Sequence, residues 1–223
     1  MTTLLLATGC AAGVLLTALL ALTLTAGTFR IWPTPGKGTW QSLVFWFLFR
    51  TLNVSAIALV VADWGSLGLV PLVLRFVALA IAGICAALYV RSLVSLGPTN
   101  TYCRRDGLVD RGIYRWTRNP QYATVIPAYL ALAVAADSAP ALVVIALLVA
   151  VYVMMAYAEE PWLQAAYPGV YDRYARRVPR FYNWHRTRAF LRLGCRQIRP
   201  FPHRLTAPAM RHLAATQMPR KRD

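Results

Sequence analysis

The sequence predicts an all-α membrane protein that crosses the bilayer about five times. Of its 223 residues, 58% are hydrophobic and only 14% are charged. Several apolar runs are long enough to cross the hydrocarbon core of a bilayer, which is roughly 30 Å thick. A soluble fold of this length could not bury all of these runs in one core. The composition therefore indicates a multi-pass membrane protein.

Five apolar spans account for most of the first 158 residues. They are Thr3–Ala26, Gln41–Ala62, Leu69–Leu96, Tyr122–Ala136 and Ala139–Ala158. Only a few residues separate the last two spans, so we expect these to form an antiparallel helical hairpin. The fourth span is short for a full crossing, and we expect it to tilt or to be covered by neighbouring helices.

The net charge of +16 is distributed as in a membrane protein. Fourteen of the 24 basic residues follow Glu159, and five more lie between Arg104 and Arg118. The loops after the second and fourth spans instead carry Asp63 and Asp137. This alternation predicts that the N-terminus lies outside and that the long loop and the C-terminus lie in the cytoplasm. The composition suggests that the membrane is a bacterial inner membrane. Anionic membrane lipids attract such basic clusters. No motif accompanies the charge that would predict a nucleic-acid partner.

Three arginines fall within or near the ends of the spans. Arg75 and Arg91 are close enough to helix ends for their charged groups to reach the interface. Arg50 lies deeper, where an ionisable group needs a partner or a polar cavity.

The chain divides into three parts on this interpretation. Residues 1–68 form an N-terminal two-helix region, residues 69–185 form a core that includes the hairpin, and residues 186–223 form a basic cytoplasmic tail. Arginines at positions 188, 192, 196 and 199 make one stripe on a helix, which predicts a basic amphipathic helix on the membrane surface. We expect disorder near the C-terminus. The four cysteines are scattered, and no metal site is predicted.

Two polar segments stand apart from the apolar background. Residues 107–122 lead into the fourth span, and residues 159–180 follow the fifth. Because these spans form a hairpin, both segments emerge at the same membrane face and we expect them to be neighbours. The second segment opens with the Glu159–Glu160 pair. Either nearby arginines neutralise these carboxylates, or one of them holds the ammonium group of a ligand, and spacing alone leaves both alternatives open.

These segments resemble the motifs of the isoprenylcysteine carboxyl methyltransferase and phospholipid methyltransferase families. Residues 112–122 are similar to the pattern Gly-x-Tyr…Arg-His-Pro-x-Tyr. Residues 159–179 are similar to Glu-Glu-x-x-Leu…Tyr-x-x-Tyr…Arg-Val-Pro. The resemblance covers about residues 93–181, with both motifs in the expected order and topology. It implies an integral membrane methyltransferase that uses S-adenosylmethionine.

The resemblance also implies a role for individual residues. The cofactor pocket would be shaped by Tyr114, Arg118, Asn119, Pro120, Tyr122, Tyr171 and Tyr174. Glu160, or else Glu159, would bind the amino group of the cofactor, as suits a carboxylate beside an ammonium in a poorly hydrated site. Arg177 would face the acceptor or the carboxylate of the cofactor. Glu160 and Arg177 are thus the candidates for the catalytic centre.

The acceptor is expected to be a lipophilic molecule that enters from the bilayer. Asn119 replaces the histidine of the motif, and because asparagine does not titrate it cannot act as a general base. A carboxylate, with a reference pKa of roughly 3.5, is already ionised at neutral pH and needs no base. This favours oxygen or thiolate acceptors, and the resemblance then implies O-methylation of a carboxylate of the isoprenylcysteine type. Phospholipid N-methylation, a membrane reductase of the sterol reductase type that uses NADPH, and a non-enzymatic adaptor remain the alternatives. The oligomeric state stays open.

Overall fold

The computed structural model describes residues 1–36, 38–96, 108–110 and 112–182, and all regular secondary structure in these ranges is helical. The helices are α1 (Thr2–Thr25), α2 (Trp40–Ala62), α3 (Leu72–Leu96), α5 (Pro120–Ala136), α6 (Ala139–Ala166) and α7 (Val170–Arg177), with a 3₁₀ turn, η1 (Gly112–Arg115), before α5. Since no strand occurs in the described ranges, the all-α prediction is confirmed. The predicted amphipathic helix of the tail lies outside the described residues.

Helix length separates four full spans from one short helix. The helices α1, α2, α3 and α6 are long and apolar enough to cross a membrane. The 17 residues of α5 correspond to a length of about 26 Å, at the lower limit for a crossing. The 28 residues of α6 correspond to about 42 Å, so this helix extends past a hydrocarbon core of about 30 Å. The multi-pass helical architecture is confirmed with four candidate spans, and α5 is a short apolar helix at the position of the predicted fourth span, whose crossing stays a prediction.

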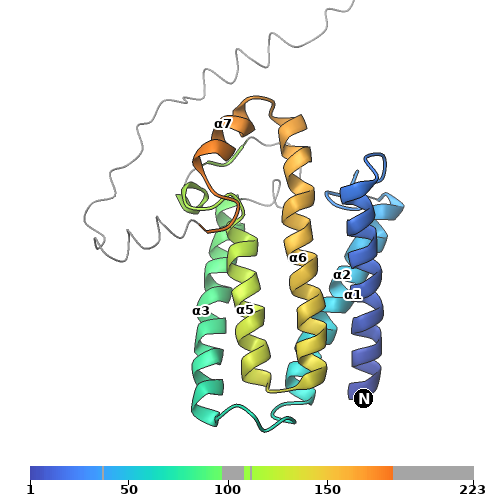
Figure 1. Ribbon diagram of the computed structural model, residues 1–223, viewed down its shortest axis with the longest axis vertical. Coiled ribbons are helices and arrows are strands. Elements are labelled where there is room, and N and C mark those ends of the chain that lie inside the picture. Colours follow the sequence, from blue (N-terminus) through green and yellow to red (C-terminus); the bar gives the residue numbers. More distant parts are fainter. Residues whose placement is uncertain (37, 97–107, 111, 183–223) are drawn as a thin grey trace, which may run out of the picture. The chain divides into compact units, whose positions relative to one another are not determined.

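The helices pack around α6. This helix contacts α1, α2 and α5, and α3 packs against α5 at the edge of the bundle. Figure 1 shows α3, α5 and α6 as successive neighbours. The core contains fully buried residues of α1, α2 and α6, among them Leu16, Phe45, Leu52 and Leu148. Apolar side chains also cover the outside, as expected for helices that face lipid.

Two glycines on α1 let three helices approach closely. Gly9 and Gly13 are four residues apart and therefore share one face of α1. A Cβ atom at Gly9 would lie 2.9 Å from the Cβ of Ser55 on α2 and 3.0 Å from a methyl group of Val144 on α6. Small residues at such positions are the usual means of close packing between membrane helices, because lipid supplies no hydrophobic drive for association.

Arg75 has a structural role that the sequence did not predict. Its side chain is buried against the rest of the protein. The Nε atom donates to the carbonyl of Ala135 at 2.9 Å, and the guanidinium lies over the ring of Trp64, 4.3 Å from its centroid. The last carbonyls of a helix have no partner within the helix, so a buried arginine can satisfy them and the negative end of the helix dipole. Arg75 therefore caps the C-terminus of α5.

Asp137 fixes the turn of the α5–α6 hairpin at the same end. It adopts a left-handed conformation with φ of 49°, and its carboxylate accepts hydrogen bonds from the backbone N–H groups of Leu69 and Val70. The neighbouring Ser138 donates to Asp63 at 2.6 Å. This hydrogen bond and one from Ser66 lower the pKa of Asp63. The two acidic residues that the charge pattern placed outside thus join the hairpin to the loop between α2 and α3.

The helix α6 is longer than predicted at its C-terminus. The expected span ended at Ala158, but α6 continues to Ala166 and includes Glu159 and Glu160. Pro161 lies inside the helix and removes only one backbone donor, so the following turn still forms. The two carboxylates therefore point from a rigid helical turn and not from a loop. This extension positions the site described below.

We expect the two substitutions Gly9→Ala and Gly83→Ala to differ in their effect on stability. A methyl group at Gly9 overpacks the contact of α1 with α2 and α6, and this should cost about 1–3 kcal/mol. A Cβ atom at Gly83 on α3 would meet nothing within 4 Å, so alanine there should be neutral or stabilising by up to about 1 kcal/mol. Thermal unfolding in detergent, followed by tryptophan fluorescence, measures both. Equal stability of the two variants would contradict the close packing at Gly9.

Candidate active site

The two polar segments meet at one end of the bundle, called the site end below, where η1 and α7 lie. The backbone N–H of Arg118 donates to the carbonyl of Pro179 at 2.9 Å. The hydroxyl of Thr117 and the side-chain amide of Asn119 both donate to the carbonyl of Arg180, at 2.9 and 3.1 Å. These bonds join residues about sixty positions apart, and they confirm that the two segments are neighbours.

The start of α5 follows from these hydrogen bonds. Asn119 is the N-cap residue, but its side chain makes no capping bond because the amide is used on Arg180. Pro120 then occupies the first turn, where a missing N–H costs nothing and the fixed φ angle suits a helix. Asparagine thus has a structural task at this position, and no titration is needed for it.

Glu160 is neutralised by two arginines. Its carboxylate accepts two hydrogen bonds from Arg180, at 2.7 and 2.5 Å, and lies 3.1 Å from Nη1 of Arg118. The side chain of Glu160 is only 13% exposed. Arg180 also covers the ring of Tyr157, 3.9 Å from its centroid, and its bonds to Glu160 raise its pKa. Such a bidentate, poorly hydrated pair is among the stronger polar contacts in proteins.

Glu159 points in a different direction and meets aromatic donors. Its Oε1 atom accepts a hydrogen bond from Nε1 of Trp32 at 2.8 Å and another from the hydroxyl of Tyr122. Neither donor carries a charge, so the carboxylate has no cationic partner among the described salt bridges. Glu159 lines a cavity, whereas Glu160 does not. Consecutive residues of a helix differ by about 100° in direction, which explains their separate surroundings.

The cavity has a volume of about 310 Å³, within the range of small-molecule sites. The last turns of α3, the first turn of α5 and the C-terminal half of α6 all line it. The loop at Leu108 and Val109, η1 and α7 line the site end. The opposite part reaches into the bundle between Trp46 and Phe49 of α2, Tyr89 of α3 and Tyr152 of α6.

Tyrosines of η1 and α7 form the wall at the site end. Gly169, with φ of 68°, allows the sharp turn between α6 and α7. Tyr171 is fully buried, and the hydroxyl of Tyr174 donates to the carbonyl of Tyr114 at 2.7 Å. Burial raises the pKa of Tyr171 to about 12 and also raises the pKa values of Tyr114 and Tyr174. These phenols are therefore neutral at pH 7 and are unsuited to accept a proton from a substrate.

Arg118 lines the same cavity and has a buried donor without a partner among the described residues. Its Nη1 atom lies near Glu160 and donates to the hydroxyl of Tyr171 at 3.3 Å. Its Nε–H group is buried and has no hydrogen-bond partner among the described residues. Leaving such a donor unpaired costs about 1–3 kcal/mol, or more for a charged group. A ligand with an anionic oxygen would satisfy it.

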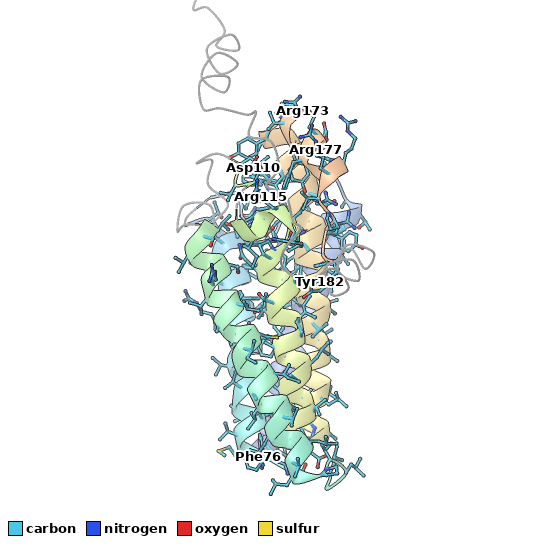
Figure 2. All side chains as sticks on the ribbon, turned by 90° about the vertical axis from the view of Figure 1, so that its left-hand side faces the viewer. Phe76, Asp110, Arg115, Arg173, Arg177 and Tyr182 are labelled. Atoms are coloured by element: carbon cyan, nitrogen blue, oxygen red, sulfur yellow. The ribbon has the colours of Figure 1, made fainter. Side chains whose placement is uncertain are left out.

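The structure brings most of the predicted site residues together. All of the predicted cofactor-binding residues except Glu160 line the cavity. Arg177, the predicted contact of the acceptor, is exposed at the end of α7 and does not line it. Figure 2 shows Arg177 with Arg115 and Arg173 on the outer side of the site end, far from Phe76 at the opposite end. The role of Arg177 stays a prediction.

Several residues of the site were not predicted from the sequence. Trp32 belongs to the loop before α2, where it stacks on Phe45 with ring centroids 4.5 Å apart. Trp46 and Phe49 belong to α2, and Arg180 follows α7. The two predicted parts, residues 1–68 and 69–185, therefore contribute to one cavity. The only signal in the sequence was the density of aromatic residues between Trp40 and Phe49.

We expect Arg180→Gln to destabilise the fold without changing the backbone carbonyl that holds Thr117 and Asn119. The substitution leaves Glu160 with one cation in place of two, which should lower the free energy of unfolding by about 1–3 kcal/mol. The control is Arg176→Gln, an exposed position of α7 that should change stability by less than about 0.5 kcal/mol. If thermal unfolding in detergent gave the same midpoint for both variants, the paired arginines would not stabilise the site end.

Comparison with known proteins found one family that matches this part of the chain. Residues 73–169 match the model of the family described as Phospholipid methyltransferase. No curated protein and no solved structure was found to match the chain. The matched range runs from the start of α3 to the turn before α7, and so includes the hairpin and both carboxylates. The part of the chain that forms α3, α5 and α6 is thus similar to the phospholipid methyltransferase family.

Proposed function

We propose that the chain transfers a methyl group from S-adenosylmethionine to a lipophilic acceptor. The observation that carries this proposal is that Glu159 and Arg118 both line one cavity. A carboxylate without a cationic partner and a buried N–H without an acceptor, both among the described residues, suit the ammonium and the carboxylate of an amino acid. The methionine end of S-adenosylmethionine is such a zwitterion. The tyrosines at the site end offer flat surfaces for its adenine ring.

We assign the ammonium contact to Glu159 in place of Glu160. Two arginines already neutralise Glu160, which lies outside the cavity lining. Binding an ammonium there would require one of these ion pairs to break. Glu159 needs no such change, because Trp32 and Tyr122 orient its carboxylate by neutral hydrogen bonds. When bound, the cofactor supplies a methyl group that a nucleophile can displace from a sulfonium.

The residues of the cavity contribute alignment and exclusion of water. The aromatic walls around Glu159 keep the site dry, which strengthens its charge contacts. Alignment of nucleophile and methyl group is the main requirement of a direct displacement. The neutral phenols provide no base, and Glu159 is used for the cofactor. These features support an acceptor that is ionised by itself, such as the carboxylate of an isoprenylcysteine-type lipid.

Phospholipid N-methylation is the second candidate, because the matched family is described as Phospholipid methyltransferase. An amine acceptor would have to lose its proton to water or to Glu159.

A reductase that uses NADPH has less support. A phosphorylated dinucleotide needs several cations, whereas Arg118 is the only cationic residue in the described lining and already contacts Glu160. We infer that the acceptor approaches from the bilayer and the cofactor from the cytoplasm.

We expect Glu159→Gln and Glu160→Gln to separate binding from folding. Glu159→Gln keeps the shape but removes a charge-assisted contact, and it should weaken S-adenosylmethionine binding by roughly 1.5–3 kcal/mol, about ten- to a hundredfold in Kd. Glu160→Gln should instead lower the unfolding midpoint, because two arginines lose their counter-ion. Isothermal titration of both variants, with thermal unfolding in parallel, measures the two effects. Undiminished affinity in Glu159→Gln would refute the assignment.

A further inference from the structure

Arg50 carries a charge within a membrane-spanning helix. It lies ten residues after the start of α2, about 15 Å along the helix axis. Its side chain is exposed, and it takes part in no salt bridge among the described residues. A charged group at such a depth is costly in hydrocarbon and usually marks a functional site. The sequence predicted that Arg50 needs a partner or a polar cavity.

The guanidinium of Arg50 lies beside the wall of the cavity. Its Cζ atom is 5.8 Å from the ring centroid of Trp46, one turn earlier on α2. Trp46 lines the cavity, as does Phe49. The side chain therefore points along α2 toward its N-terminus, the usual direction for helical residues, and hence toward the site end. Arg50 stands at the boundary between the cavity wall and the lipid-facing side of α2.

The helices on either side of this boundary do not close it by packing. The cavity is lined by Trp46 and Phe49 of α2 and by Tyr89 and Leu93 of α3. The described part of α3 packs extensively against α5, whereas α2 packs against α1 and α6. Between α2 and α3, the cavity therefore takes the place of direct helix–helix packing. Exposed apolar side chains such as Phe47 and Val90 cover the two helices beside it, as lipid contact requires.

We propose that Arg50 binds the anionic head group, a carboxylate or a phosphate, of a lipid that enters the cavity between α2 and α3. This inference rests on the proposed function, because the lipid would be the acceptor or its anionic part. An arginine is suited to this task because its planar guanidinium binds carboxylate and phosphate in a bidentate manner. The pairing also removes the cost of an isolated charge at membrane depth. The lipid chain then stays among apolar side chains.

The purified protein in nanodiscs of zwitterionic phosphatidylcholine provides a direct test with brominated lipids, which quench nearby tryptophans. The anionic probes are brominated stearate, at a pH where its carboxylate is ionised, and brominated phosphatidic acid. Their neutral counterparts are the methyl ester and the diacylglycerol with the same chains. We expect at least one anionic probe to quench at concentrations about tenfold below its neutral counterpart. Trp46→Phe should remove most of this quenching, because Trp46 is next to Arg50.

Arg50→Gln should abolish the preference for the anionic probe, and Arg50→Lys should keep part of it. The matched control is Arg91→Gln, an exposed arginine of α3 that does not line the cavity, and it should keep the whole preference. Preference for stearate alone or for phosphatidic acid alone would each support the site and identify its head group. An unchanged preference in Arg50→Gln, or an equal loss in Arg91→Gln, would overturn it.

Titration with S-adenosylmethionine separates this inference from the proposed function. The Arg50 and Arg91 variants, whose positions do not line the cavity, should bind the cofactor as the wild type does, which also shows that they are folded. If the wild type failed to bind S-adenosylmethionine, the proposed function would fail. The quenching preference would then still decide whether Arg50 binds an anionic lipid.

Discussion

The buried carboxylate of Glu160 holds the site end of the molecule together. It pairs with Arg118 from the loop before α5 and with Arg180 from the segment after α7. The carbonyl of Arg180 in turn accepts the hydrogen bonds that fix Thr117 and Asn119. Because Arg180 is bound through both its side chain and its backbone carbonyl, the loop before α5 and the segment after α7 are held together. The arrangement also holds Arg118, whose Nε–H has no partner among the described residues.

The cavity lies beside this arrangement. The start of α5, the loop before it and α7 line one part of the cavity, while Trp46, Phe49 and Tyr152 continue the space into the bundle. The cavity thus has a polar part around Glu159 and Arg118 and an aromatic part near the lipid. A polar cofactor and a lipophilic acceptor require these two environments.

Much of the fold and part of the site could be predicted from the sequence, for physical reasons that also set the limit of prediction. Long apolar runs and short connections predicted the helices and the hairpin, because lipid demands helices of a fixed length. The motif between Tyr114 and Tyr122 correctly predicted residues that line the cavity. The sequence did not predict Trp32, because its bond to Glu159 joins positions 127 residues apart. Nor could it assign the roles of Glu159 and Glu160, since these depend on where Arg118 and Arg180 lie. The capping role of Arg75 was not predicted either, because the carbonyls that it caps come close to it only in the folded hairpin.

The cavity beside Glu159 should accept S-adenosylmethionine if the proposed function is correct. Calorimetric titration of the purified wild-type protein with S-adenosylmethionine, with S-adenosylhomocysteine and with NADPH tests this most directly. The geometry predicts saturable binding of both sulfur compounds, since they share the amino acid that Glu159 and Arg118 would hold, and no binding of NADPH at the same concentrations. Saturable binding of NADPH, with no binding of S-adenosylmethionine, would contradict the proposed function.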